Sequence, residues 1–228
     1  MTPPWVQARA IFSFARIDPA RTALLVIDLQ RGFIDPEVAM AGRAVDGAEA
    51  VIRHANRLAM ALRAAGGTVA FIRHTGSDDP ALSVPAWQKE VPGLALLDSV
   101  MRPGQSAHRL DPRLDVTSDD LIVDKYRYSA FIRGSSDLEA LLGERGIDTL
   151  IVTGAFTNFC CESTARDAMM LGYRVIFVGD ATLARTPEEH EMGLIAVQLA
   201  FADLRTADAT IALIAACTNA EAGERARA

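Results

Sequence analysis

Short apolar runs recur along the chain and are separated by segments with helical periodicity. These runs are rich in branched aliphatic side chains and do not alternate with polar residues, as is typical of strands buried on both faces. We predict a strand at each of the six, over residues 22–28, 68–73, 121–124, 149–153, 174–179 and 210–214.

Helical signals lie between several of these runs. Apolar residues spaced three and four positions apart predict one helix, and Ser136-x-x-Glu139 and Thr186-Pro187-x-Glu189 are capping boxes that open two others. We predict helices over residues 45–62, 136–146 and 158–171, and from Thr186 onward. Strands that alternate with helices imply an α/β protein with a mostly parallel sheet and helices on both faces.

Residues 75–117 break this alternation. The segment holds five prolines and little period, so we expect a long excursion over the functional edge of the sheet. The 228 residues contain no internal repeat and suit a single domain, 1–228, whose core covers about 22–214 between two short tails.

Composition narrows the range of partners. The chain has 23 Lys and Arg against 29 Asp and Glu, a net charge of −6, and no basic run, which argues against nucleic acid and anionic membranes. Its apolar runs are too short to cross a bilayer, and Pro3 and Pro4 interrupt any signal peptide. We therefore expect a cytoplasmic protein that binds a small molecule.

Metal and cofactor motifs do not occur in the sequence. Cys160, Cys161 and Cys217 form no C-x-x-C pair, and the four histidines lack the spacing of a zinc site. Neither a dinucleotide-binding G-x-G-x-x-G nor a P-loop is present. We predict no metal and no cofactor, with the cysteines either buried or reactive.

Three chemically active residues follow predicted strands. In an open parallel sheet, ligands bind beyond the carboxyl ends of the strands. Asp28, Lys125 and Cys160 each lie just after an apolar run. Together they would provide a nucleophilic thiol, a proton acceptor and a cation that favours the thiolate.

Each of the three also has a structural alternative. Cys160 lies in the first turn of a predicted helix, which favours a thiolate, but free cysteines are also common in cores. Asp28 could cap a turn near Gly32 and Pro36. Lys125 is one of only two lysines among the 23 basic residues, which suggests a specific use of its ammonium group, although chance or solvent exposure explains it equally well.

Three motifs resemble the isochorismatase-like cysteine hydrolases. They are Leu25-Val-Ile-Asp-Leu-Gln30, Asp124-Lys-Tyr-Arg-Tyr-Ser-Ala-Phe131, and Gly154-x-x-Thr-Asn-x-Cys160 followed by Glu162-Ser-Thr-Ala-Arg-Asp-Ala168. The resemblance runs from about Thr22 to Ile214. It implies a three-layer α/β/α sandwich around a six-stranded sheet and a catalytic triad of Asp28, Lys125 and Cys160.

The resemblance also implies a mechanism. A thiol attacks an amide-type carbon, and water hydrolyses the resulting acyl- or carbamoyl-enzyme. The backbone N–H groups of Phe156 and Cys160 would form the oxyanion hole, with a cis peptide between Ala155 and Phe156. Tyr128, Phe33, Trp87 and Asn158 are the predicted substrate contacts, Gln105 and His108 are further pocket-lining residues to consider, and Cys161 is expected to face the core.

Differences between branches of the family narrow the range of reactions that we expect this chain to catalyse. Isochorismatases proper lack the cysteine, so Cys160 favours hydrolysis of a C–N bond. Nicotinamidases carry an Asp-x-His metal site, whereas residues 33–76 offer only His54 and His74. The motif from Lys125 to Phe131 looks most like the ureidoacrylate amidohydrolase branch. This implies a small amide or ureido substrate. The family resemblance also implies a homodimer or homotetramer. Two alternatives remain: a catalytically inactive relative that binds a metabolite or partner, and a nicotinamidase-type amidase.

Overall fold

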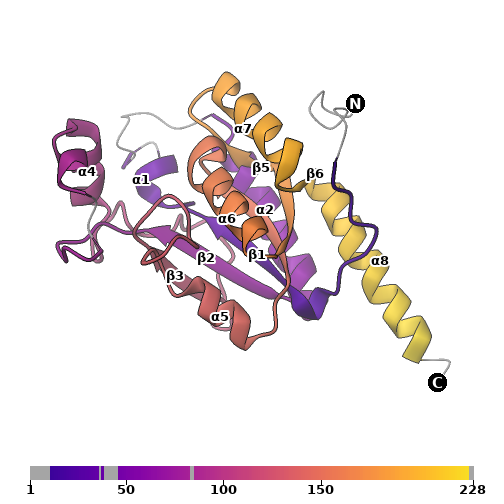
Figure 1. The fold of residues 1–228 in the computed structure, drawn as a ribbon. Helices are drawn as coiled ribbons and strands as arrows, with labels where there is room; N and C mark the ends of the chain where they lie inside the picture. Colours follow the sequence, from indigo (N-terminus) through magenta and orange to yellow (C-terminus); the bar gives the residue numbers. More distant parts are fainter. Residues whose placement is uncertain (1–10, 36, 39–45, 83–84, 226–228) are drawn as a thin grey trace.

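A six-stranded parallel sheet forms the centre of the protein. The computed structural model describes residues 11–35, 37–38, 46–82 and 85–225, with side chains up to residue 217. Within these ranges the strand order is β3-β2-β1-β4-β5-β6, and every pairing is parallel (Figure 1). The strands are β1 (Thr22–Ile27), β2 (Thr68–His74), β3 (Leu121–Lys125), β4 (Thr149–Ala155), β5 (Arg174–Leu183) and β6 (Asp203–Arg205).

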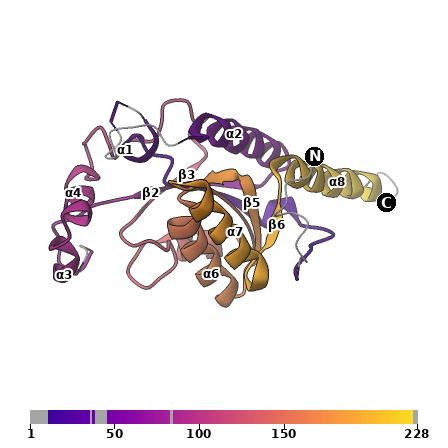
Figure 2. The same ribbon diagram turned by 90° about the horizontal axis from the view of Figure 1, so that it is seen from above.

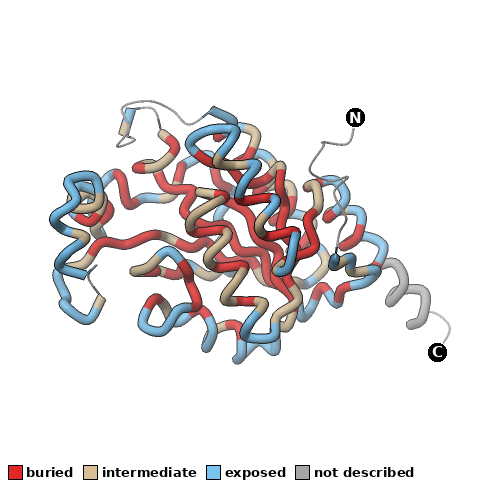
Figure 3. The backbone as a smooth tube through the Cα atoms, turned by 45° about the horizontal axis from the view of Figure 1, so that its top comes forward, coloured by how far each residue is buried: buried red, intermediate tan, exposed pale blue. Residues whose placement is uncertain are grey.

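Helices cover both faces of this sheet. Leu24 and Val26 of β1 pack with α2 and α8 on one face, whereas Leu25 and Ile27 face the layer that contains α5, α6 and α7 (Figure 2). The buried residues concentrate in the strands and on the inner sides of these helices (Figure 3). The five helices are α2 (Ala48–Ala64), α5 (Leu138–Glu144), α6 (Glu162–Met170), α7 (Pro187–Ala200) and α8 (Ala207–Arg225).

The predicted three-layer α/β/α fold and five of its six strands are confirmed. The strand predicted over 210–214 is wrong, because these residues lie inside α8 and the sixth strand is the short β6 before it. Thr210 donates its hydroxyl to the Thr206 carbonyl one helical turn earlier, and Ile214 is buried against the sheet. The β-branched residues there form the apolar face of a helix, so the composition of a short run was misleading.

The predicted helices occur with shifted boundaries. Thr186 caps α7 by accepting a hydrogen bond from the Glu189 backbone N–H at 3.2 Å, as the capping box predicts. The Ser136 hydroxyl accepts from the Leu138 N–H, so α5 begins two residues after it. The start predicted at Val45 lies outside the described residues, and α2 begins at Ala48.

The 75–117 excursion contains two helices that the sequence pattern does not predict. They are α3 (Ala86–Lys89) and α4 (Pro92–Val100), which lie beyond the ends of β2 and β3 (Figure 1). Gly76 lets the excursion pack closely beside the end of β2, because a Cβ atom there would lie 1.9 Å from the Asp98 carbonyl oxygen, and its N–H donates to the Met101 carbonyl at 2.8 Å. No helix in the described residues is both long and apolar enough to span a membrane.

Candidate active site

The ends of three parallel strands, β1, β3 and β4, bring the predicted triad to one edge of the sheet. Asp28 follows β1 directly, in a left-handed backbone conformation with φ of 52° that ends the strand. Lys125 is the last residue of β3. Cys160 lies in a π-helical turn, η3 (Thr157–Cys161), that connects β4 to α6.

The Lys125 ammonium joins the other two side chains. Its Nζ lies 2.8 Å from the Asp28 Oδ2 and 3.2 Å from the Cys160 Sγ, and donates to the Arg127 carbonyl at 3.1 Å. All three triad side chains are buried, and that of Lys125 is completely inaccessible. The structure therefore brings the three residues together as one buried cluster.

Burial and mutual attraction determine the charges of Asp28 and Lys125. Burial raises the pKa of Asp28 above its usual value, and the opposing effect of Lys125 does not cancel the rise. Burial also works against the Lys125 charge, but the attraction and hydrogen bonding of Asp28 and Cys160 together outweigh it and raise the lysine pKa. Asp28 is therefore a stronger base than a solvent-exposed aspartate, and Lys125 keeps its proton.

The thiol of Cys160 differs from the sequence-based expectation of a favoured thiolate. Burial raises its pKa well above the ordinary range, the Asp28 charge raises it further, and Lys125 opposes both. The expected effect of the cation is present, but desolvation and the neighbouring carboxylate are larger. The resting thiol is therefore neutral, with the Asp28 carboxylate beside it.

A glycine permits the close approach of the strands that carry Asp28 and Cys160. Gly154 of β4 has a φ of 117°, and a Cβ atom there would lie 2.0 Å from the Ile27 carbonyl oxygen. Any side chain would therefore push β4 away from the end of β1. The next peptide, between Ala155 and Phe156, is cis as expected, and Phe156 starts the turn that carries Cys160.

Gln30 is a structural residue that sequence reasoning recorded only as part of a motif. Its amide donates to the carbonyls of His74 at 3.0 Å and His108 at 2.8 Å, and its Oε1 accepts from the His74 N–H at 2.7 Å. These bonds replace the sheet ladder where β1 and β2 diverge, so they hold open the edge at which Asp28 lies.

A cavity of about 400 Å³ opens above the triad. Its walls are mainly aromatic rings and leucines, and Arg185 is the cationic side chain among them. The lining includes Asp28, Cys160, Phe33, Phe156, Phe159, Tyr128, Leu94, Leu96, Leu97, His74 and Arg185. The Cys160 thiol thus faces a largely apolar chamber large enough for a small organic molecule.

Two of the four predicted substrate contacts line this cavity. Phe33 and Tyr128 do so, and the Phe33 ring packs edge-on against Phe156 with centroids 5.6 Å apart. Trp87 is 64% exposed on α3 and does not line it, which reflects how little the sequence of the excursion says about its fold. Asn158 is half-buried beside Cys160 but also outside the lining, with its Oδ1 unpartnered among the described residues.

The two further pocket residues considered from the sequence also lie outside the cavity. Gln105 is exposed, and His108 is buried with its Nε2 2.8 Å from the Thr75 hydroxyl and 3.5 Å from Asp124. His108 therefore ties the excursion to the ends of β2 and β3. Cys161 faces the core as expected, with its thiol directed to the Thr153 carbonyl at 3.8 Å.

His74 also lines this cavity, although its sequence context suggested only a possible metal ligand. It ends β2 and pairs in register with Lys125, so the same strand-end rule that identified Asp28 would have found it. Burial lowers its pKa well below the usual value, and Lys125 lowers it further, so the ring is neutral. In the part of the chain that the structure describes, no group of three or more His, Cys, Asp or Glu side chains is placed to hold a metal ion.

Comparisons with known proteins match this chain to the isochorismatase family. The sequence model of the isochorismatase domain matches residues 22–209. The isochorismatase family protein YwoC of Bacillus subtilis is 33% identical over 186 residues, covering 78% of this chain and 86% of YwoC. The ureidoacrylate amidohydrolase RutB of Caulobacter vibrioides is 34% identical over 188 residues, covering 75% and 81%.

A solved structure agrees with these sequence matches. The crystal structure of a cysteine hydrolase from Pseudomonas syringae pv. phaseolicola superposes with a TM-score of 0.80 and 28% sequence identity. The alignment covers 92% of this chain and 99% of that one. The likeness therefore includes nearly the whole described fold.

Proposed function

The chain belongs to the isochorismatase family of hydrolases, and we propose from this that it cleaves a C–N bond of a small amide or ureido compound with Cys160 as nucleophile. One observation carries the proposal: the Lys125 Nζ lies within 3.2 Å of both the Asp28 carboxylate and the Cys160 thiol at the floor of a cavity. A thiol, a base and a fixed cation in contact are the components of nucleophilic acyl transfer.

The first half-reaction forms a bond between sulfur and carbon. As the Cys160 sulfur attacks the carbonyl carbon, its proton passes to the Asp28 carboxylate, whose raised pKa suits it to this task. The carbonyl oxygen becomes an oxyanion, which the backbone N–H groups of Phe156 and Cys160 are proposed to stabilise. Collapse of this intermediate expels the nitrogen, which leaves as an amine or ammonia with the proton from Asp28.

The second half-reaction regenerates the enzyme. Asp28, again a carboxylate, takes a proton from water as the water oxygen attacks the thioester carbon. The C–S bond breaks, the sulfur recovers the proton from Asp28, and the acid product leaves. Lys125 keeps its proton throughout and holds the base and the nucleophile in register, since its ammonium contacts both.

The cavity lining supports a small substrate with an unsaturated or acidic part. The rings of Phe33, Phe156 and Phe159 suit a planar amide or ureido group, and the named activity of the relative RutB is hydrolysis of ureidoacrylate. Arg185 lines the same cavity and could pair with a carboxylate, although it already contacts Glu189 at 2.7 Å. Ureido acids are therefore the first compounds to test.

The neutral thiol supports one competing function. A family member that only binds a metabolite would also keep its cysteine protonated and buried. The two functions differ in whether a covalent intermediate forms at Cys160.

Ammonia release from ureido acids, carbamoyl amino acids and simple aromatic amides tests the proposal. Turnover by the wild type and its loss in Cys160→Ala are expected, with an acyl- or carbamoyl-adduct on Cys160 detected by mass spectrometry after rapid quenching. Cys161→Ala is the matched control, since the neighbouring thiol points to the core and should be dispensable for turnover. Binding without turnover or adduct across the panel would favour the binding protein, and retained activity in Cys160→Ala would exclude the thiol mechanism.

A further inference from the structure

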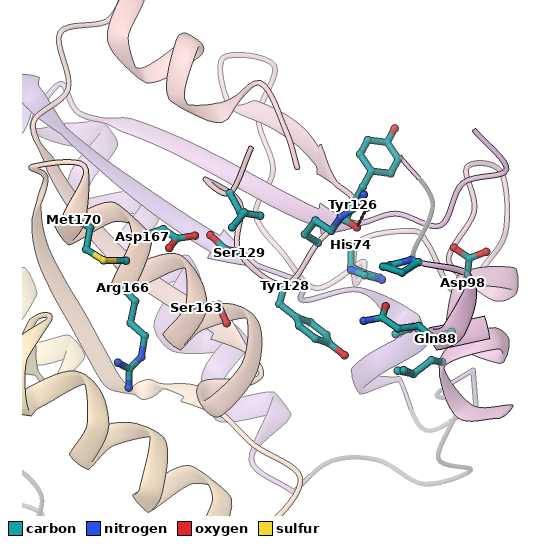
Figure 4. A pocket seen from close by; sticks show the side chains of 15 residues that line it. His74, Gln88, Asp98, Tyr126, Tyr128, Ser129, Ser163, Arg166, Asp167 and Met170 are labelled. Carbon is teal, nitrogen blue, oxygen red and sulfur yellow. Dashed lines mark hydrogen bonds between the residues drawn. The ribbon is translucent and has the colours of Figure 1, made fainter. Parts of the chain in front are cut away.

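A second and larger cavity, of about 480 Å³, adjoins the one above the triad. It extends from His74 past Tyr128 to the outward side of α6, as Figure 4 shows. Its far wall includes Ile132 of the loop after β3 and Ser163 and Met170 of α6. Neither the family match nor the proposed chemistry assigns anything to it.

The two cavities share part of their lining. Four residues, His74, Leu94, Leu97 and Tyr128, line both of them. Tyr128 is 40% exposed and stands between the two chambers, with its ring 5.8 Å from that of Phe159 on the side of the triad. Tyr128 therefore marks the place that a molecule occupying both cavities would have to pass.

The walls of the second cavity suit an uncharged group. Three of its charged side chains are already paired: Arg166 with Glu162 at 2.7 Å, Asp98 with Arg102 at 3.3 Å, and Arg127 with the carbonyls of Leu82 and Tyr126. Asp167 lies next to Met170 at the end far from His74 (Figure 4). Beside the uncharged polar residues Gln88, Ser129 and Ser163, the remaining lining is apolar or aromatic, and such surface gains free energy when it covers an apolar group. Its members are Pro85, Leu94, Leu97, Tyr126, Tyr128, Ile132 and Met170.

The junction itself carries an unused polar atom. The Nδ1 of His74 is buried and has no hydrogen-bond partner among the described residues, although the ring lines both cavities. Buried polar atoms normally find a partner, so an unpaired one beside a cavity indicates where a ligand makes a hydrogen bond. Because His74 lines both cavities, a substrate that spans them passes this residue.

We propose that the two cavities form one bipartite substrate site. On the basis of the proposed function, the amide or ureido group lies in the cavity above Cys160, and the second cavity holds an uncharged aliphatic or aromatic group attached to it. The imidazole of His74 hydrogen bonds to the substrate where the two parts join. The substrate class is then an amide or ureido compound with an extended apolar substituent.

A chain-length series tests this assignment. For straight-chain primary amides and alkylureas, kcat/KM should rise roughly threefold with each added methylene until the second cavity is filled. Ser163 lines the second cavity but not the first, so Ser163→Phe should remove this length dependence. A kcat/KM that does not change with chain length in the wild type would overturn the bipartite site. So would the same dependence on chain length in Ser163→Phe as in the wild type.

Two further variants control for folding and bulk. Ala140→Phe adds the same ring at an exposed position of α5 that lines neither cavity and should keep the wild-type slope. Met170→Trp blocks the second cavity from a position that is 66% exposed, so it serves if Ser163→Phe does not fold.

Binding separates this proposal from the proposed function. Calorimetry of the Cys160→Ala protein with short and long amides measures the subsite without turnover. Tighter binding of the long amides, lost on adding Ser163→Phe, supports the subsite even if the wild type hydrolyses nothing. Equal binding of short and long amides would overturn the subsite even if the hydrolase function holds.

Discussion

The two adjoining cavities differ in how their walls are built. The floor of the first is a cluster of charges buried at strand ends, in which Lys125 is fully enclosed. The far wall of the second consists of side chains such as Ile132 and Met170, which are more than half exposed. Under the proposed function, the sheet would fix the reacting groups while loops and outward helix surfaces would select the substrate.

The largest effect is expected from substitutions of the buried charged residues beneath the first cavity. Asp28→Asn removes the proton acceptor, so kcat should fall by roughly 10²–10⁴-fold. Lys125→Met should slow turnover comparably and should also lower the free energy of unfolding by about 3–5 kcal/mol, because it leaves a buried carboxylate unpaired. Steady-state kinetics and denaturant unfolding measure the two effects.

The double variant Asp28→Asn with Lys125→Met serves as the control. It removes both charges, so its stability should recover relative to Lys125→Met while its activity stays low. Recovery of activity together with stability would mean that the pair acts only through the fold.

Alkylation of Cys160 by iodoacetamide distinguishes the two charges by sign. The Asp28 charge raises the thiol pKa, so Asp28→Asn should increase the thiolate fraction and speed alkylation roughly tenfold at pH 8, although it slows turnover. Lys125 lowers the thiol pKa, so Lys125→Met should slow alkylation. Because the wild-type thiol is neutral at rest, its alkylation rate should still be rising above pH 8. Identical pH profiles in the three proteins would refute this electrostatic account; Cys161→Ala serves as the background.

A smaller effect is expected at the junction of the two cavities. His74→Phe keeps the ring volume but removes the nitrogen atoms, so KM should rise several-fold to about tenfold, with kcat changed less. His74→Gln, which restores a hydrogen-bonding group, should recover part of the affinity. A loss confined to kcat, or no recovery in His74→Gln, would argue that the ring acts on the triad rather than on the substrate.

No effect is expected from removing metal ions. Exhaustive dialysis against a chelator should leave full activity, since the proposed chemistry uses the thiol, the carboxylate and backbone N–H groups. Activity lost with EDTA and recovered with zinc would place the protein with the nicotinamidases and make His54 or His74 a ligand.

The same contrast explains how far the sequence could predict the structure. Asp28, Lys125 and Cys160 follow apolar runs, and a parallel sheet brings strand ends to one edge, so the pattern predicts that they share this edge. Their direct contact depends on the strand order, which the pattern does not give. Gln30 could not be assigned a role, because the backbone groups that it satisfies become unpaired only when β1 and β2 diverge. The neutral state of the Cys160 thiol depends on burial, which spacing does not reveal.

The excursion was the least predictable region. The short helices α3 and α4 are positioned by contacts with the sheet edge, such as that of Gly76 with Asp98, rather than by an amphipathic period of their own. Trp87 therefore lies on the surface although aromatic residues often line pockets. At the other end of the chain, the run at 210–214 was mistaken for a strand because five residues carry too little period to separate the two structures.

The exposure of the outer wall has an evolutionary consequence. Substitutions at exposed positions such as Ile132 and Met170 usually change the free energy of unfolding by no more than about 0.5 kcal/mol, whereas one at Lys125 leaves a charge stranded in the core. A lineage can therefore acquire new substrates by single, nearly neutral steps along the second cavity while inheriting the reacting groups intact. Diversity of substrate within one conserved chemistry is then the expected outcome of drift and selection on this scaffold.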